Sequence, residues 1–459
     1  MVDEVRGETA AVRLFGGPFP AGGLDTGDPG AWTDFDLGVR WDIRYGALPP
    51  DGPDAPGPDP VARAARALCH PDGRVRESAL GEALAHPVLL PLLVLRAADW
   101  GAPVRERARR LLTGALDARS AFALAPVVLR AGERARGTFA VELLGAVLRR
   151  APREEVLRLC AHPERAVRRF AVRLAVGEGR FSPAELARRA HADHDVVVRS
   201  VCADAALAAL ARGADREGVL EPLLTARGPR VRAAGVTALR RAGLPERAQG
   251  FLADRSALVR AGARYVVRQD GRDPLSWYRE RCAGPEVPPD AVIGLAECGQ
   301  RGDAAVLWPL LGHPVPRIRA RAMAGLRLLD AVDPARLLPL LDDPAPGVVR
   351  ETVAALLPSA RSLPDGTLTD RLAGHRPRAT RVGAFRLLVA RGDVAGLRTA
   401  VGLLGDTDEG LRERAERAVR RWQPTEPGNP EVGVLLEAAR HLFDDDAYTR
   451  RRWMAGLPR

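Results

Sequence analysis

One short phrase recurs about every 31 residues: a hydrophobic residue, then an arginine, then a small residue three positions later. The steps between successive arginines stay near 31 residues, except for one step of 59 that spans two periods and contains a degenerate copy near residues 290–295. A fixed period in this range is typical of repeat architectures, in which stacked units form one continuous body. The pattern therefore overrides the three or so domains that 459 residues would otherwise suggest. Its arginines are Arg76, Arg105, Arg136, Arg168, Arg199, Arg232, Arg260, Arg319, Arg350, Arg381 and Arg412.

A single repeat predicts two antiparallel helices. Residues 99–103 read as a turn, and hydrophobic residues then recur at helical spacing from Val104 to Leu116. A second turn at 117–120 leads into a second apolar helix at 121–129. A hairpin of this size cannot bury its apolar face alone, but it can when it is stacked on its neighbours. Because 46% of the residues are hydrophobic and only 5% are aromatic, the composition also favours packed helices, and we predict an all-α fold.

The position six residues before the arginine is also patterned. It holds aspartate or histidine in eight repeats, and proline often follows it. An aspartate in a turn accepts backbone N–H groups and starts the next helix, and proline cannot continue the previous one. We expect histidine to serve the same turn, which explains four of the eight histidines without any chemistry. These residues are His70, Asp99, His162, Asp193, Asp254, His313, His375 and Asp406.

The combined motif, as it stands in residues 162–175 and 343–356, resembles the HEAT repeat. Its short length resembles the HEAT-like repeats of phycobilin lyases and of many bacterial scaffolds. The resemblance covers about residues 60–422 and implies a right-handed α-solenoid, or superhelix, of armadillo type with about eleven or twelve helical hairpins. In that family the arginine is held by the loop aspartate of a neighbouring unit, which forms a ladder along the stack. The four repeats with histidine in the loop depart from the family pattern at this ion pair.

Two regions lie outside the repeats. Residues 1–59 form a segment rich in glycine and proline that ends in a stiff linker, and we expect it to be non-helical. Within it, residues 32–46 alternate apolar and charged side chains, which predicts a β-strand or a tight hairpin that caps the first repeat or receives a partner strand. Residues 423–459 follow a break rich in proline and are expected to form a C-terminal helical cap. The alternating apolar residues are Phe35, Leu37, Val39, Trp41, Ile43 and Tyr45.

The net charge and the cysteines limit the partners and the cellular location that we expect. The net charge is +11 and all 69 basic residues are arginine, which indicates either a phosphate-rich partner or a GC-rich coding bias. No signal-like N-terminus is present, and the longest apolar run, at residues 87–95, is too short to span a bilayer. We therefore expect no membrane partner, a cytoplasmic location and no disulfide framework. The five cysteines are Cys69, Cys160, Cys202, Cys282 and Cys298.

No residue pattern predicts a catalytic site or a cofactor. The chain has no phosphate-binding glycine loop, no nucleophile elbow and no His-Glu-x-x-His motif. His191, His194 and Asp195 have metal-ligating side chains at close spacing. They align with the turn between two repeats, and no convincing third and fourth ligand completes a site, so we predict no bound metal.

The best candidates for a binding surface are arginine pairs at helix ends and a few aromatic residues. Arginine pairs at the ends of helices can bind phosphate, or they can simply complement the helix macrodipole in solvent. Tryptophan and tyrosine can anchor a partner or a stacked base, or they can pack between repeats. The partner-binding candidates are Arg240, Arg241, Trp277, Tyr278, Arg420, Arg421 and Trp422, and similar arginine pairs occur at Arg109, Arg110, Arg149 and Arg150.

The sequence favours a non-enzymatic, monomeric scaffold that holds a protein or peptide partner on its concave surface. Nucleic-acid binding is the alternative, and it includes a resemblance to HEAT-like DNA glycosylases that remove alkylated bases. Those enzymes use a concave cluster of tryptophans and a carboxylate, and no tryptophan and aspartate spacing in this chain matches that cluster. A role as a chromophore-lyase subunit is supported by the repeat type alone.

Overall fold

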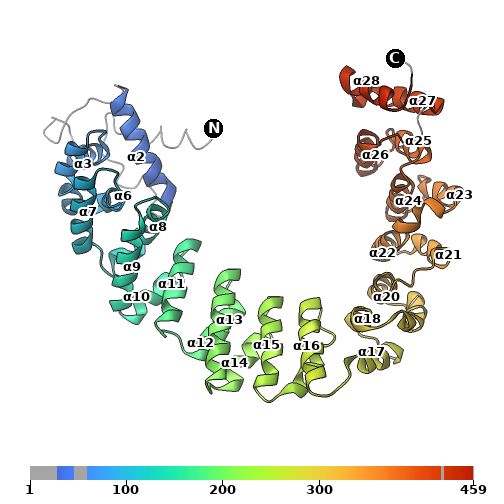
Figure 1. Cartoon of the computed structure of the whole chain (residues 1–459), viewed down its shortest axis with the longest axis horizontal. Helices are drawn as coiled ribbons and strands as arrows, with labels where there is room; N and C mark the ends of the chain where they lie inside the picture. Colours follow the sequence, from blue (N-terminus) through green and yellow to red (C-terminus); the bar gives the residue numbers. More distant parts are fainter. Residues whose placement is uncertain (1–27, 46–58, 425–427, 458–459) are drawn as a thin grey trace. The chain divides into compact units, whose positions relative to one another are not determined.

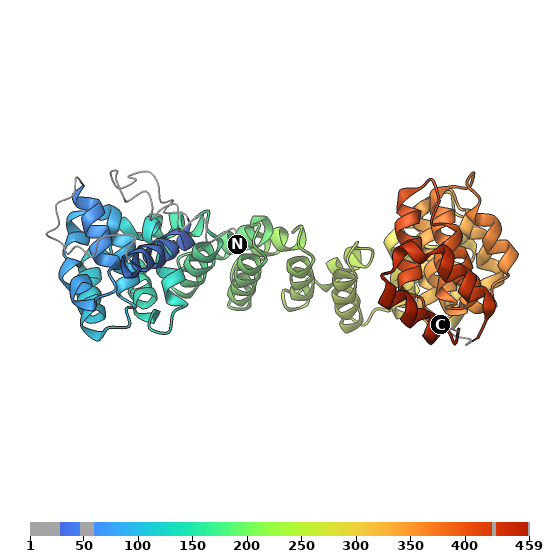
Figure 2. The same ribbon diagram turned by 90° about the horizontal axis from the view of Figure 1, so that it is seen from above.

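The computed structural model describes residues 28–45, 59–424 and 428–457. In these residues every regular element is a helix, and no strand occurs. The chain divides into two compact units, Met1–Ala238 (unit 1) and Leu239–Arg459 (unit 2). In each unit the helices are stacked one after another in chain order (Figures 1 and 2). The predicted all-α solenoid of HEAT-like hairpins is confirmed.

The α-helices of unit 1 pair as hairpins, α8 with α9, α10 with α11 and α12 with α13, and α11 also packs on α13 of the next hairpin. The last of them, α15, ends just beyond the boundary of the unit. The α-helices are α2 (Pro29–Arg44), α3 (Pro60–Cys69), α4 (Gly73–Ala79), α5 (Glu82–Ala85), α6 (Leu90–Arg96), α7 (Ala102–Ala115), α8 (Ser120–Gly132), α9 (Thr138–Arg150), α10 (Arg153–Cys160), α11 (Arg165–Gly177), α12 (Pro183–Ala192), α13 (Val196–Ala211), α14 (Arg216–Leu224) and α15 (Pro229–Arg241), with the 3₁₀ helix η2 (Pro87–Leu89).

Unit 2 has the same organisation, but one helix of several hairpins is short, as in α19, α21 and α23. The longer helices of successive repeats, α18, α20, α22 and α24, pack on one another in order. The α-helices are α16 (Ala257–Gln269), α17 (Pro274–Ala283), α18 (Pro289–Cys298), α19 (Ala304–Leu307), α20 (Pro316–Leu328), α21 (Pro334–Leu337), α22 (Pro346–Leu356), α23 (Asp365–Thr369), α24 (Arg378–Ala390), α25 (Val394–Gly402), α26 (Glu409–Arg421), α27 (Pro430–Ala438) and α28 (Asp445–Met454). The 3₁₀ helices are η3 (Pro245–Phe251), η4 (Arg301–Asp303), η5 (Pro309–Gly312), η6 (Leu338–Asp342), η7 (Leu357–Ser362), η8 (Asp370–Leu372) and η9 (Arg440–Leu442).

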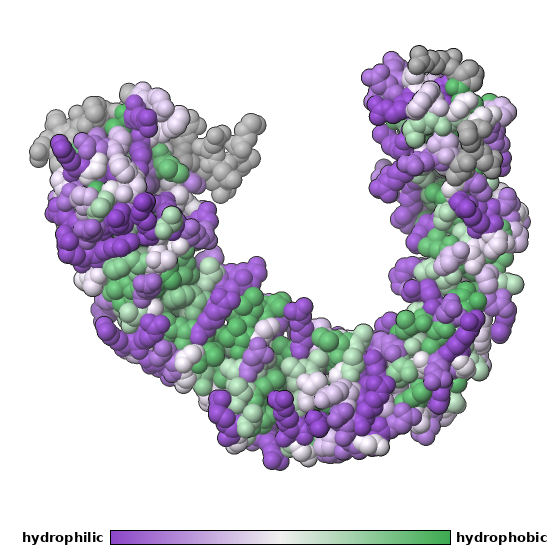
Figure 3. All heavy atoms as spheres, in the orientation of Figure 1, coloured by the Kyte–Doolittle hydropathy of each residue, from purple (hydrophilic) through white to green (hydrophobic). Residues whose placement is uncertain are grey.

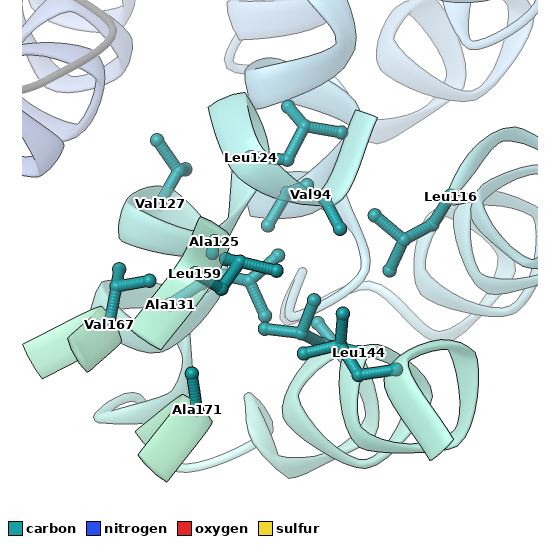
Figure 4. Close-up of a cluster of buried hydrophobic side chains, with 14 of the residues drawn as sticks. Val94, Leu116, Leu124, Ala125, Val127, Ala131, Leu144, Leu159, Val167 and Ala171 are labelled. Atoms are coloured by element: carbon teal, nitrogen blue, oxygen red, sulfur yellow. The ribbon is translucent and has the colours of Figure 1, made fainter. Parts of the chain in front are cut away.

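The core of each unit lies between the paired helices. In unit 1, side chains from α6, α8, α9, α10 and α11 point toward one another in a continuous apolar cluster (Figure 4). The small residue of the repeat is fully buried, as Ala171, Ala322 and Ala384 show. On the face seen in Figure 3, patches of hydrophobic residues alternate with bands of hydrophilic residues. The period of the sequence pattern therefore corresponds to one layer of helix packing.

The arginine ladder of the HEAT repeat is present in part. The Arg76 guanidinium donates from Nε and Nη2 to both carboxylate oxygens of Asp99 in the next loop, at 3.0 and 2.9 Å. Its third nitrogen donates to the His70 carbonyl in its own loop at 2.7 Å. Arg319 repeats both kinds of bond, with Asp343 and with the His313 carbonyl. Arg381 also pairs with Asp406, but its bond within its own repeat goes to the Leu372 carbonyl.

The loop position holds its turn in the same way whether it is aspartate or histidine. The Asp99 carboxylate accepts the Gly101 backbone N–H at 2.9 Å. Nδ1 of His162 accepts the Glu164 backbone N–H at the same distance, and His70 and His313 do likewise. The prediction that histidine serves the turn is confirmed at these three repeats.

Two signature arginines of the sequence pattern are out of register. Arg136 lies in the turn before α9, and Arg350 falls one residue late on α22, where it is exposed. Aligning the buried helix faces puts a valine at the arginine position in these two repeats and in the degenerate copy. The loop that follows each of these valines carries a histidine, so histidine replaces aspartate where the preceding repeat has no arginine to pair. The valines are Val141, Val292 and Val349, and the histidines are His162, His313 and His375.

The prediction of a β-strand within residues 32–46, and of a non-helical N-terminal segment, is wrong for the described part: α2 spans Pro29–Arg44. Asp28 accepts the Gly30 N–H at 2.9 Å, and Pro29 occupies the first helical turn, which is a strong helix start. Alternation placed six apolar residues on one strand face, but a helix divides them. Phe35, Val39 and Ile43 are buried at helical spacing, while the other three are exposed on the opposite face.

The helix α2 packs on α3, α6 and α8 and so covers part of the first repeats (Figures 1 and 2). The expected cap is therefore present as a helix and not as a hairpin. The glycine- and proline-rich linker that we predicted before residue 60 lies mostly outside the described residues. At the other end, α27 packs on α25 and on α28. No helix in the described ranges is both long enough and apolar enough to cross a membrane.

Candidate functional site

Three of the predicted binding residues line one surface pocket of unit 2, which we call the arginine pocket. It has a volume of about 370 Å³ and lies between the end of α26 and the side of α28. No aspartate or glutamate is among its lining residues. The lining residues are Arg420, Arg421, Trp422, Gln423, Pro424, Ala447, Arg450, Arg451 and Met454.

The first wall of the pocket is the C-terminal end of α26. Arg420 and Arg421 form the last turn of this helix, where positive charge complements the macrodipole. Trp422 leaves the helical conformation and ends α26, and Pro424 follows it. The Trp422 indole N–H donates to the Asp393 carbonyl at 3.3 Å, which fixes the ring against the apolar cluster of α25, α26 and α27.

The second wall is α28, whose Arg451 side chain is held in place. It donates to the Trp422 carbonyl at 2.7 Å and to the Arg420 carbonyl, so it satisfies two carbonyl groups at the end of α26. Its guanidinium also lies 4.8 Å from the centre of the Phe443 ring. Burial lowers the pKa of Arg451, but a guanidinium stays protonated in proteins, so this group supplies a fixed positive charge.

The other three arginines of the pocket are exposed. Arg420, Arg421 and Arg450 form no ion pair with any residue that the structure describes. Ladder arginines such as Arg76 and Arg319, by contrast, use their N–H groups on carbonyls and carboxylates inside the chain. The pocket is thus a place where several guanidinium groups have donors left for a ligand.

The chemistry of the pocket suits an anion with an apolar neighbour. Guanidinium groups recognise carboxylates and phosphates through paired N–H donors. Trp422, Pro424 and Met454 add apolar surface beside these donors. Nothing in the lining can act as a nucleophile or as a general base, so the pocket fits binding and not covalent chemistry.

The structure corrects one predicted binding residue. Tyr278 has no exposed surface, and its hydroxyl donates to the Leu252 carbonyl at 2.7 Å. Burial raises the pKa of Tyr278 to about 12. Tyr278 is therefore a core residue of unit 2 and offers no surface to a partner. The sequence did not show whether this ring is turned toward the core or toward solvent.

The other candidates lie away from the pocket. Trp277 is half-buried, with its ring edge-on to Tyr278 at 5.2 Å and the Arg281 guanidinium 5.6 Å from its centre. Arg240 and Arg241 are exposed in the last turn of α15. None of these residues is among the lining residues of the arginine pocket.

The cluster of possible metal ligands serves the repeat turn. Nδ1 of His191 lies 3.0 Å from the Pro222 carbonyl, and His194 is exposed. The Asp195 carboxylate accepts hydrogen bonds from Arg165 and Arg169. No group of three or more histidine, cysteine, aspartate or glutamate side chains is placed to hold a metal within the described ranges.

The cysteines are free, and four of the five are buried. Burial raises the pKa of Cys160 to about 11 and those of Cys202 and Cys282 to about 12. A thiol with such a pKa holds little thiolate at neutral pH, so these side chains act as small core residues.

The sequence reasoning missed Arg450 and Arg451. The signal was present, because residues 450–452 are three consecutive arginines in the last helix, a denser run than either of the pairs that we singled out. Only the packing of α28 against the end of α26 shows that this run and Arg420–Arg421 face one pocket.

No family model and no curated protein sequence matches the chain. Among solved structures, importin beta in an ammonium sulfate condition matches at 10% identity and a TM-score of 0.40, covering 96% of this chain and 70% of its own. A structure of Kap95p binding RanGDP matches at 11% identity and 0.37, covering 82% and 61%. Kap121p matches at 12% identity and 0.33, covering 98% and 53%. The chain thus spans less than two thirds of the Kap95p and Kap121p chains, and scores this low assign no partner.

Proposed function

We propose that this protein is a non-enzymatic scaffold that binds a protein or peptide partner on the concave surface of its HEAT-like repeats, as a monomer in the cytoplasm. The arginine pocket is its anchor for an acidic segment of that partner. The observation that carries the proposal is the gathering of Arg420, Arg421, Arg450 and Arg451 around one pocket that no carboxylate lines.

An acidic peptide fits the pocket better than a nucleic acid does. Single-stranded nucleic acids are bound along positively charged grooves with aromatic side chains on which successive bases stack. Here three exposed arginines, Arg451 and one partly buried tryptophan line a single pocket of about 370 Å³. The ladder arginines contribute to the net charge of +11, yet their donors are engaged within the fold. The global charge therefore overstates the charge available to a phosphate backbone.

The experiment is a binding titration with the full chain and a fluorescein-labelled peptide of alternating glutamate and leucine. The double variant Arg420→Gln/Arg421→Gln should bind the peptide at least about tenfold more weakly than the wild type, since each lost charge-assisted contact is worth 1 kcal/mol or more. The matched control is Arg414→Gln/Arg417→Gln, which removes the same charge from the same helix outside the pocket lining.

Equal losses in the two double variants would show that only net charge matters, and the pocket assignment would fail. The alternative function is tested in parallel with a single-stranded and a duplex oligonucleotide of about 20 residues. Because nucleic-acid binding weakens steeply with salt, the measurement is made at physiological ionic strength. Nanomolar binding there, or release of an alkylated base, would put nucleic-acid recognition first.

A further inference from the structure

The helix α2 has the contacts of a bound ligand. It packs on α3, α6 and α8, and we call the surface that these helices present to it the docking face. Trp32, Phe35 and Val39 are completely buried against the docking face, and Ile43 nearly so. These side chains follow the spacing i, i+3, i+7 and i+11, which is one stripe of a helix. The docking face therefore recognises an amphipathic helix with large apolar residues at these positions.

A buried cation sits beneath the middle of this stripe. The Asp36 carboxylate accepts hydrogen bonds from Arg96 of α6 and from Arg40 of α2 itself, the latter at 3.1 Å. The Arg96 side chain is 2% exposed, and its second carboxylate contact is Asp99 at 3.3 Å. Asp99 already pairs with Arg76. Without Asp36, two buried guanidinium groups would share one carboxylate, and an uncompensated buried charge is strongly unfavourable. The docking face thus selects helices with a carboxylate at i+4.

The fit of α2 leaves polar groups unsatisfied. The indole N–H of Trp32, the hydroxyl of Thr33 and Nε of Arg96 are buried and have no hydrogen-bond partner among the described residues. Each such group subtracts from the stability of the docked state, because water would satisfy it once α2 left.

The outer face of α2 is not covered by another described helix. Leu37, Trp41 and Tyr45 lie along it and are 56%, 64% and 63% exposed. In the sequence, residues 46–58 connect α2 to the segment that begins α3. The helix can therefore leave the docking face without displacing any described element of the stack.

We propose that the docking face is a binding site for a partner helix of this chemistry: large apolar residues at i, i+3, i+7 and i+11, and a carboxylate at i+4. In the isolated chain α2 occupies the site as a tethered ligand, and a partner helix of the same pattern exchanges with it. The carboxylate at i+4 meets Arg96 and gives the site its specificity, since a helix without it leaves that charge unpaired.

The test uses the full chain with a protease site inserted between residues 52 and 53, so that cleavage unties α2 after the protein has folded. The probe is a fluorescent peptide of residues 28–45. After cleavage the peptide should replace α2 and bind saturably, whereas the uncleaved chain should bind it at least about tenfold more weakly, because the tether raises the effective concentration of α2.

Two variant peptides distinguish specific recognition from nonspecific binding. The peptide with Asp36→Asn should bind the cleaved chain about tenfold or more weakly, since it leaves Arg96 without its partner. The peptide with Asp34→Asn loses the same charge two residues away and should bind like the wild-type peptide. Equal binding of the two variants would overturn the proposed role of Arg96.

The remaining outcomes also decide the question. If the cleaved chain keeps α2 for days and takes up no peptide, α2 is a permanent part of the core and the proposal fails. If cleavage unfolds unit 1, as seen by amide exchange across α6 and α8, the proposal also fails, because the site then does not exist without its occupant. Peptide-reversible dimers of the uncleaved chain would support the docking face with a second copy of α2 as the occupant.

Discussion

At the scale of single residues, the absence of a side chain at Gly294 lets two helices of unit 2 approach. A Cβ atom there would lie 2.4 Å from Cε1 and 2.6 Å from Cζ of Tyr278. The tyrosine ring cannot move aside easily, because its hydroxyl is bonded to the Leu252 carbonyl and the side chain is fully buried. The contact between α17 and α18 therefore depends on glycine at this position.

We predict that Gly294→Ala lowers the free energy of unfolding of unit 2 by about 1–3 kcal/mol, the usual range for overpacking. Denaturant unfolding followed by circular dichroism measures the change. Gly347→Ala, in the first turn of α22, is the control, since a Cβ atom there would meet nothing within 4 Å. An alanine at 294 that is as well tolerated as one at 347 would contradict the packing.

A second residue-scale prediction concerns acid stability. The pKa of Asp195 is about 2: burial alone would raise it, but hydrogen bonds from Arg169 and from the backbone N–H of Val197 outweigh that effect. In the unfolded chain the pKa of an aspartate is about 3.9. The unfolded state therefore binds more protons between these values, and the stability contributed by Asp195 is present above about pH 4 and lost as the pH falls through about 2.

We expect Asp195→Asn to be destabilising at neutral pH and to reduce the loss of stability on acidification from about pH 5 to about pH 3. Thermal melts of the full chain at several pH values, with amide exchange used to follow unit 1, measure the loss of stability at neutral pH and its dependence on acid. Asp204→Asn, an exposed aspartate on the same α13, should leave the acid profile unchanged. A profile that is the same in both variants would contradict the role of Asp195.

At the scale of elements, a proline inside α8 is matched by a histidine from the loop before α11. Pro126 has no N–H, so the Phe122 carbonyl one turn earlier lacks its helical donor. His162 donates to that carbonyl through one ring nitrogen and accepts the Glu164 N–H at Nδ1. This arrangement needs the neutral imidazole, and burial lowers the pKa of His162. The turn bond at Nδ1 therefore forms only while the imidazole is uncharged, whereas the bond to the Phe122 carbonyl raises the pKa of His162 and is outweighed by burial.

From this we predict a stability loss in mildly acidic solution. Since the folded pKa of His162 lies below its unfolded value of about 6.5, its contribution is complete above that pH and declines as the pH falls toward the folded pKa. The variant His162→Asn should lose the corresponding part of the pH dependence of unit 1 between about pH 7 and pH 5. His194→Asn, which removes an exposed histidine, should keep it.

The elements also show how far the sequence could be interpreted. The hairpins were predictable because a repeated period averages out local ambiguity over many copies. The segment around α2 occurs once, and Phe35, Val39 and Ile43 satisfy both a two-residue and a helical period. The deciding signals were the Asp28 cap and Pro29, which lie just outside the alternating stretch. Trp422 and its two preceding arginines were identified from sequence, but Arg451 joins them only through the packing of α28.

At the scale of the whole molecule, the two compact units should respond separately to local damage. In a stacked array each helix contacts only its neighbours, so a defect spreads by losing adjacent layers. We predict that Gly294→Ala raises amide exchange within residues 239–459 and leaves exchange in α8 to α12 at wild-type rates. Mass spectrometry of exchanged peptides tests this directly. A uniform rise over both units would show that the chain unfolds as one cooperative body.

The matching of loop histidines to missing arginines has a consequence for anyone who edits this array. The identity of the loop residue at the start of one repeat depends on the residue at the arginine position of the previous repeat. Aspartate follows Arg76, and histidine follows Val141, Val292 and Val349. Duplicating or deleting one complete two-helix hairpin would separate these partners. It would also place charged side chains next to each other without a group of opposite charge to pair with. The sequence unit that keeps these partners together is therefore shifted relative to the hairpin. It begins at one signature helix and ends at the loop residue of the next repeat. Insertions and deletions whose boundaries follow this shifted unit should be tolerated better than those whose boundaries follow the hairpin.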